Sequence, residues 1–293
     1  MTAAMLRATV SLVVCATALS VAAPVHGFCR TTTTPIPAGY DPTATGCIPE
    51  GTPLAWPSMP VTYELEQEAS SQVTFADATA ILDRSFAKWS AVQCSPTAPT
   101  DHPGITFRNT GPTDSGYANC EGGPCGFTAQ TAPHVILFRD QGWPYTDPSN
   151  TLALTTVTYG VETGHIFAAD TEINSAPGHV LSTTIPPPSG AYSLEVIVTH
   201  ESGHFIGLAH SQFDTAVMYA FYQPDAVTLT ADDVAGVCAA YPPPGPSKGC
   251  SCRMAKGEGA AGAAAGAIVL GAAAARRRRR RAPSRGPHRS LRL

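Results

Sequence analysis

The segment from His200 to His210 reads HESGHFIGLAH and constrains the chain more than any other feature. On a helix, His200 and His204 lie four residues apart on one face, so both imidazoles can reach one metal ion. A straight helix cannot bring His210 to the same point, because six further residues advance its axis by about 9 Å. Gly207 gives the backbone the freedom to turn there. The spacing therefore predicts three nitrogen ligands and a helix that ends near Gly207.

Three imidazoles leave one coordination position open, which is the arrangement of a catalytic zinc rather than a structural one. Glu201 lies beside the ligand face, where it can take a proton from a zinc-bound water whose pKa the metal lowers to about 7. The hydroxide would attack a peptide carbonyl, and Glu201 would return the proton to the leaving amine. The motif predicts peptide-bond hydrolysis with Glu201 as general base. The alternative is a non-catalytic, zinc-stabilised surface adhesin or peptide-binding module, which needs no general base.

The motif continues into Ser211 and is followed by Ala216-Val217-Met218-Tyr219, and together they resemble the metzincin zinc peptidases. Met218 stands in the place of the Met-turn methionine. Ser211 after the third histidine is similar to the matrixin branch, the peptidase M10 type. The resemblance covers roughly residues 60–241. It implies an α+β, zincin-like catalytic domain with a twisted, mixed five-stranded sheet and three main helices.

The resemblance also assigns a substrate-binding strand, the sheet edge that would pair with an extended peptide by β-augmentation. That strand includes Leu152, Ala153, Leu154, Thr155 and Thr156. Residues 220–227 would form the wall of the S1′ pocket. The implied cofactor is one catalytic Zn²⁺, the implied partners are protein or peptide substrates, and we expect a monomer.

Two matrixin motifs do not occur in the sequence. One is the cysteine switch PRCGxPD, so the mechanism of latency is left open. The other is the HxD spacing of a second, structural zinc site. We therefore interpret His134, His165 and His179 as core or solvated histidines.

The charge of the body excludes one class of partner. Residues 28–252 carry six basic residues against 21 acids, a net charge of −15. A strongly acidic surface disfavours nucleic acid, whose phosphates require basic neutralisation. The acids suit calcium binding, with Asp170 and Glu172 as candidates, or they serve solubility alone.

The N-terminus has the pattern of a secretory signal peptide over residues 1–27. Arg7 supplies the positive start, and the apolar run 11–23 is short for a membrane span. Val25 and Gly27 provide small residues before a cleavage site at Phe28. A retained membrane anchor is the alternative.

Cysteine usage agrees with export, because an even number in an exported chain suggests disulfides. The body contains Cys29, Cys47, Cys94, Cys120, Cys125 and Cys238. Six cysteines allow 15 connectivities. Cys29–Cys47 and Cys120–Cys125 are the locally easy pairs, which leaves Cys94–Cys238.

The C-terminal residues differ from the body. A linker with Cys250 and Cys252 covers 244–259, an Ala/Gly-rich apolar segment covers 260–275, and an Arg-rich tail covers 276–293. As a helix the apolar segment reaches about 24 Å, short of a hydrocarbon core of about 30 Å. The order resembles the MYXO-CTERM sorting signal, which implies processing near Cys250 and display on the outer surface of a Gram-negative, myxobacterium-like bacterium. A disordered low-complexity tail is the alternative.

Within residues 58–243, hydrophobic periodicity predicts the elements of the catalytic domain. Helices are expected at 75–92, 194–208 and 229–241, the last two capped by Ser193 and Thr230. Strands are expected at 61–65, 105–107, 134–138, 151–159 and 165–174. Residues 28–57 are expected to be irregular and stapled by a disulfide, and 109–131 to be loop.

Overall fold

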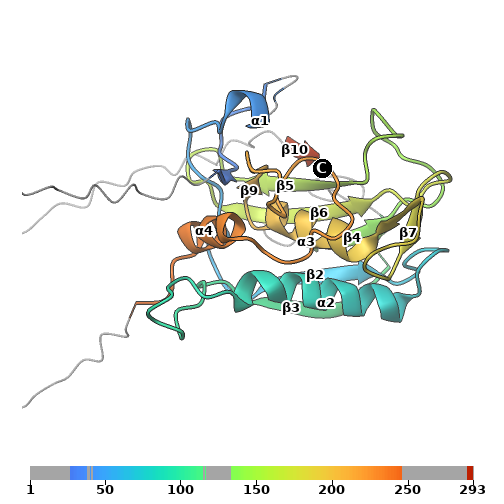
Figure 1. Cartoon of the computed structure of the whole chain (residues 1–293), viewed down its shortest axis with the longest axis horizontal. Helices are drawn as coiled ribbons and strands as arrows, with labels where there is room; N and C mark the ends of the chain where they lie inside the picture. The colour runs from blue at the N-terminus through green and yellow to red at the C-terminus, as the bar shows by residue number, and fades with distance from the viewer. Residues whose placement is uncertain are drawn as a thin grey trace, which may run out of the picture.

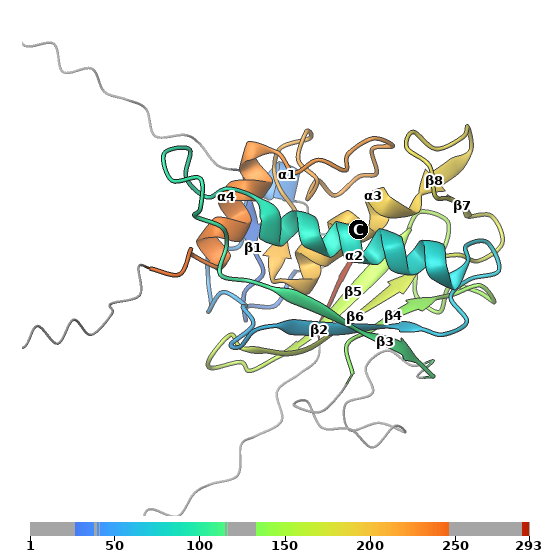
Figure 2. The same ribbon diagram turned by 90° about the horizontal axis from the view of Figure 1, so that it is seen from below.

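The computed structural model describes residues 27–37, 40, 42–114, 116, 133–245 and 289–292. Within these residues one mixed sheet of six strands forms the centre of the molecule (Figures 1 and 2). In spatial order the strands are β10 (Arg289–Arg292), β5 (Ala153–Tyr159), β6 (Ile166–Ile173), β4 (Val135–Phe138), β2 (Val61–Glu66) and β3 (Phe107–Thr113). β6, β4, β2 and β3 run parallel, whereas β5 runs antiparallel to both of its neighbours.

Strands β2 to β6 form the expected mixed five-stranded sheet, and β10 adds a sixth strand that was not predicted. Residues 289–292 belong to the segment predicted as an Arg-rich tail, yet they pair with β5, with Ser290 opposite Thr156 and Leu291 opposite Thr155. An edge strand offers unpaired N–H and C=O groups that another extended segment can satisfy. The edge predicted to receive substrate is therefore occupied by the chain's own residues.

Three main helices are present where they were expected. They are α2 (Phe75–Ala91), α3 (Leu194–Phe205) and α4 (Ala231–Ala240). Ser193 caps α3, and Thr230 caps α4 in a reciprocal capping box with Asp233. A short helix, α1 (Pro42–Thr45), lies in the segment expected to be irregular.

Strand β3 shows where the sequence pattern misleads. It continues to Thr113, into the stretch predicted as loop. Gly111 and Pro112 hide its strand character, because both residues are normally depleted in strands. β3 lies at the outer edge of the sheet, where proline is tolerated, and an irregularity in its pairing with β2 absorbs the glycine.

Four short strands were not predicted. β1 (Cys29–Arg30) pairs with β9 (Leu208–Ala209), and β7 (Val180–Ser182) pairs with β8 (Ala191–Ser193). Two or three residues carry too little periodicity to be recognised in a sequence. The β1–β9 pair matters for the site, because it holds the chain immediately after α3.

Helices α2 and α3 lie side by side over one face of the sheet (Figures 1 and 2). Trp89 of α2 is fully buried, and its Nε1 donates to Thr199 O at 3.0 Å and to Ser202 Oγ at 2.9 Å. Phe86 stacks on Tyr63 of β2 and meets the ring of Phe205 edge-on at 5.1 Å. The core therefore packs α3 against both α2 and the sheet.

Two disulfides join described residues, Cys29–Cys47 and Cys94–Cys238. Both are among the pairings that the sequence favoured. Cys120 and Cys125 lie outside the described residues. Cys94–Cys238 connects the segment after α2 to α4 and closes a loop of 144 residues.

Replacing both Cys94 and Cys238 by alanine is expected to lower the free energy of unfolding by about 2–5 kcal/mol, because the cross-link restricts the unfolded chain. Urea unfolding under oxidising conditions measures the change. The Cys29→Ala/Cys47→Ala double variant is the comparison, and its loss should be smaller because its 18-residue separation closes a shorter loop. Equal stability of the Cys94/Cys238 variant and the wild type would contradict the prediction.

No helix in the described part of the chain is long and apolar enough to cross a membrane. Residues 1–26 of the predicted signal peptide, the apolar segment 260–275 and the arginine run 276–281 lie outside the described residues.

Candidate active site

Helix α3 carries three of the five defined residues of the HExxHxxGxxH motif and is buried along its whole length. His200, Glu201 and His204 are 3%, 1% and 0% exposed. A helix that is apolar on several sides is expected to be buried on all of them. The predicted ligands His200 and His204 therefore lie on a helix that packing holds in one position.

The helix was predicted to reach Leu208 but ends at Phe205, and Gly207 is the reason. Its φ is +86°, and a Cβ at this position would lie 2.5 Å from the carbonyl oxygen of Leu54. Glycine alone avoids both the strain and the clash. Trp56 Nε1 donates to the carbonyl of Phe205 at 2.8 Å, which satisfies one acceptor left free at the helix end. The chain then turns toward His210.

The three histidines converge on one point. The Nε2 atoms of His200 and His204 are 3.0 Å apart, and those of His204 and His210 are 3.2 Å apart. A tetrahedral zinc with Zn–N bonds of about 2.0–2.1 Å separates its nitrogen ligands by roughly 3.3 Å. The Nδ1 atoms of His200 and His204 face the carbonyls of Val217 at 2.7 Å and Leu208 at 2.9 Å. These contacts leave the Nε2 lone pairs for a metal, so the triad fits zinc.

Burial sets the protonation of this site. It lowers the pKa of His204 to about 4 and places the pKa values of His200 and His210 well below the usual value, helped by the neighbouring imidazoles. The histidines are therefore neutral at pH 7, the form that binds metal. Burial also raises the pKa of Glu201 to about 8, against the hydrogen bond from Thr155, which lowers it. A divalent cation in the triad would favour the carboxylate.

Met218 lies directly against α3 and is 1% exposed. A Cβ at Gly203 would fall 2.1 Å from its sulfur, so the helix and the methionine touch only because residue 203 has no side chain. The carboxylate of Asp233 accepts hydrogen bonds from the backbone N–H of Val217 at 3.0 Å and of Met218 at 3.1 Å. The first turn of α4 thus holds the methionine in place.

The neighbouring acid, Asp232, connects three parts of the chain. It accepts from Ser211 Oγ at 2.6 Å and from the backbone N–H of Gly27 and Phe28 at 2.6 and 2.9 Å. From the sequence alone, Asp232 and Asp233 are acids in the first turn of a helix, where the macrodipole favours them. The Thr-x-x-Asp spacing reveals the local cap, but it carries no information about a loop 16 residues earlier.

Asp233→Ala is expected to cost about 2–4 kcal/mol of unfolding free energy, because it leaves two buried N–H groups without acceptors. Urea unfolding of the metal-free protein measures the loss. Asp225→Ala, the same substitution at an exposed position in the same region, is the matched control and should change stability by less than about 0.5 kcal/mol. Equal effects of the two substitutions would show that the contacts of Asp233 add no stability.

Strand β5 brings the predicted substrate edge beside the motif. Ala153, Leu154, Thr155 and Thr156 lie on it, and Leu152 directly precedes it. The Oγ1 of Thr155 donates to Oε2 of Glu201. The sequence placed Thr155 at this edge but did not predict its contact with Glu201.

The other candidate ligands lie apart from the triad. Nδ1 of His134 is 2.7 Å from Thr62 O, and its ring lies 4.7 Å from that of Trp56, as expected of a core histidine.

The carboxylate of Asp170, a predicted calcium ligand, accepts a hydrogen bond from Val135 N at 2.8 Å. Glu172 is fully buried and pairs with Arg139 and Tyr145. These acids serve internal contacts, and calcium binding stays a prediction. Among the described residues, His200, His204 and His210 are the group placed to hold a metal.

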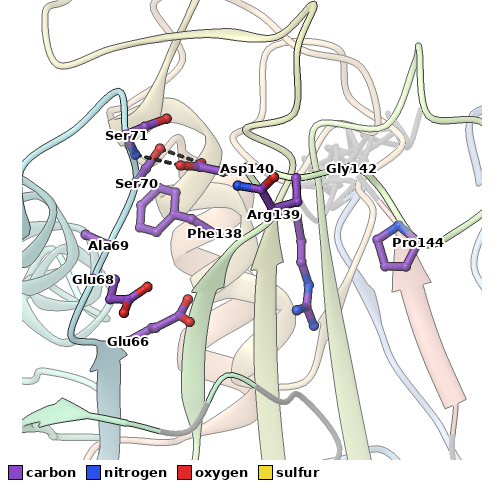
Figure 3. Close-up of a pocket in the computed structure, with 11 residues that line it drawn as sticks. Glu66, Glu68, Ala69, Ser70, Ser71, Phe138, Arg139, Asp140, Gly142 and Pro144 are labelled. Carbon is purple, nitrogen blue, oxygen red and sulfur yellow. Dashed lines mark hydrogen bonds between the residues drawn. The ribbon is translucent and has the colours of Figure 1, made fainter.

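Two hollows accompany this arrangement. A narrow pocket beside His200 lies between α3 and residues 216–226, which is where the S1′ wall was predicted. A larger cavity of about 510 Å³ lies beyond the ends of β2 and β4, and none of the three histidines lines it. Figure 3 shows Asp140 hydrogen-bonded to Ser70 and Ser71 at this cavity, with Glu66 and Glu68 at another side.

Comparison with known proteins agrees with this site. A 55-residue stretch is 51% identical to metalloendoproteinase 1-MMP of Arabidopsis thaliana and covers 18% of this chain and 15% of that protein. Over 196 residues the chain is 29% identical to metalloendoproteinase 1 of Glycine max, covering 62% and 50%. Over 111 residues it is 32% identical to probable matrix metalloproteinase 095L of Invertebrate iridescent virus 3, covering 36% and 29%. The chain thus spans half or less of the length of these relatives.

A family model extends the match over most of the described body. The Matrixin model of peptidase M10 matches residues 55–242, which is more than half of the chain and includes five of the six strands of the central sheet, all three main helices and the histidine triad. The chain therefore belongs to the matrixin family.

Proposed function

We propose that the chain is a zinc-dependent endopeptidase that hydrolyses protein or peptide substrates. One observation carries the proposal: three inward-facing imidazoles converge beside a buried carboxylate, Glu201, whose Oε1 has no hydrogen-bond partner among the described residues. A buried acceptor without a partner is costly unless something else fills the site. His200, His204 and His210 would hold the zinc. A binding module would need the metal ligands but not this carboxylate.

The zinc, Glu201 and the edge of β5 would have different roles in the reaction. Zinc, when bound, supplies a Lewis acid that acidifies water and polarises the scissile carbonyl. Oε1 of Glu201 takes a proton from the attacking water and returns it to the nitrogen of the leaving amine. The edge of β5 would orient the substrate, and its pairing with residues 289–292 supports its capacity to accept an extended peptide.

Hydrolysis of a denatured protein by the full chain tests the proposal. We expect cleavage that stops when a chelator removes the metal and returns when zinc is added. Cleavage that survives complete metal removal would refute the zinc mechanism. Stoichiometric zinc without any turnover would instead favour the adhesin or peptide-binding alternative.

We further propose that the chain is exported and displayed on the outer surface of a Gram-negative, myxobacterium-like bacterium, as a monomer that contacts a membrane only through its C-terminal segment and binds no nucleic acid. The signal-like residues 1–27, the cysteine pairs and the tail that resembles MYXO-CTERM support this proposal. Processing near Cys250 would also separate residues 289–292 from the body. The β5 edge would then be free.

A chain that ends at residue 249 is therefore expected to bind substrate more tightly than the full chain. KM should fall with kcat unchanged, because β10 competes with substrate for the backbone groups of β5 and its strand partners include no residue of the zinc motif. A synthetic peptide of residues 287–293, added back to the short chain, should inhibit competitively. Identical KM values for both chains would contradict the prediction.

A further inference from the structure

The two carboxylate oxygens of Glu201 lie in different surroundings. Oε2 accepts the hydrogen bond from Thr155, whereas Oε1 is buried and has no partner among the described residues. The side chain is 1% exposed, so bulk water does not supply the missing bond. Oε2 is therefore fixed by a hydrogen bond, and Oε1 is left to accept a proton from one direction, as a general base requires.

The hydroxyl group of Thr155, which is hydrogen-bonded to Oε2, is itself hydrogen-bonded to a second hydroxyl group. Thr155 is fully buried, and its Oγ1 lies 2.9 Å from Oγ1 of Thr171, the residue opposite it on β6. A hydroxyl has one proton to donate and can accept in return. If Thr155 gives its proton to the carboxylate, the bond between the two hydroxyls must run from Thr171 to Thr155. The direction of donation is then Thr171 to Thr155 to Glu201.

We propose that Thr155, supported by Thr171, is a positioning residue that holds Oε2 of Glu201 and thereby turns Oε1 toward the water that the metal would activate. The inference rests on the proposed function of Glu201 as general base. In this role the side chain of Thr155 acts only through the orientation of the carboxylate, whereas pairing with an extended substrate would use the backbone of β5.

Thr155→Val removes the hydroxyl and keeps the branched shape of the side chain. Without its donor, the carboxylate can rotate and present either oxygen in several directions. Misplacement of a reacting group by about 1 Å can cost a factor of 10² in rate, so we expect kcat to fall about 10-fold to 100-fold with KM unchanged. Thr155→Ser restores the hydroxyl and should recover most of kcat. Thr171→Val should give a smaller loss.

Thr79→Val is the matched control, because it makes the same substitution in α2, away from the strand that would orient substrate, and its Oγ1 has no hydrogen-bond partner among the described residues. Its kcat is expected to equal that of the wild type. Zinc affinity, measured by competition with a chelator, should be the same for both valine variants, since neither residue is a ligand. Urea unfolding of the metal-free proteins identifies any variant that has lost stability.

A double-mutant cycle separates positioning from a general structural role. In the Glu201→Gln background, Thr155→Val should produce no further loss of kcat. Crystal structures of the metal-free proteins provide a readout without activity: the Glu201 side chain should be single in the wild type and in Thr155→Ser, and multiple in Thr155→Val.

Several outcomes would overturn the inference. They are an unchanged kcat in a folded Thr155→Val protein, an equal loss in the Glu201→Gln background, or a single unmoved Glu201 conformer in Thr155→Val. If the wild type hydrolyses no peptide, the proposed function has failed. The crystal structures alone then decide whether Thr155 orients the carboxylate.

Discussion

Replacing Glu201 by glutamine is expected to lower kcat by a factor of about 10²–10⁴, the usual contribution of a positioned general base. Glutamine keeps the shape of the side chain and its place on the buried helix, but its amide cannot take a proton from water. The histidines and the carbonyls behind them are untouched. Zinc should therefore remain bound at one ion per chain, which separates loss of chemistry from loss of metal.

Steady-state hydrolysis of a fluorogenic peptide measures kcat, and metal analysis of the same samples measures zinc. Glu195→Gln is the matched control, because it makes the same change on the same helix, where Glu195 pairs with Arg84 and Lys88 at the surface of α2. Its kcat should stay close to that of the wild type. Full activity of Glu201→Gln would remove the general base from the mechanism.

Gly203→Ala is expected to destabilise the protein by about 1–3 kcal/mol or more and to weaken zinc binding, because a side chain here overpacks the core. The added Cβ would lie 2.1 Å from the sulfur of Met218 and 2.9 Å from the ring of Trp89. The sign of the effect is informative. Alanine is favoured over glycine in a helix interior by about 1 kcal/mol, so helix propensity alone predicts the opposite result.

Urea unfolding and chelator competition measure both effects. Gly236→Ala in α4 is the control, because its Cβ would meet Phe28 no closer than 3.3 Å. It should leave zinc affinity unchanged. A Gly203→Ala protein as stable as the wild type would mean that Met218 can move away without cost, and the close contact would then have no structural role.

The sequence predicted most where local chemistry decides the structure. The i, i+4 spacing of His200 and His204 requires a helix, and Gly207 marks the turn that follows. Thr230 reveals the start of α4 as its N-cap. Such features depend on a few neighbouring residues, so they can be read without knowledge of the fold.

The missed features depend on contacts between distant parts of the chain. The N–H groups that donate to Asp233 belong to a loop that only the folded chain brings to α4, and Thr171 meets Thr155 only through the register of β5 and β6. β5 is buried on both faces, so its threonines carry no alternation that would mark one as a partner of the active site. The pairing of residues 289–292 was missed for a similar reason, because an arginine-rich tail has no strand period.

The carbonyls behind His200 and His204 have a consequence for how this protein can diverge. The groups that orient both rings belong to the main chain at Val217 and Leu208, so no exchange of side chain at these two positions can delete them. Substitutions are tolerated at these two positions as long as the new side chain fits. Insertions and deletions are not tolerated, because one residue added or removed between 205 and 218 would move a carbonyl away from its imidazole. Homologues should therefore differ in the amino-acid sequence of this loop and agree in its number of residues.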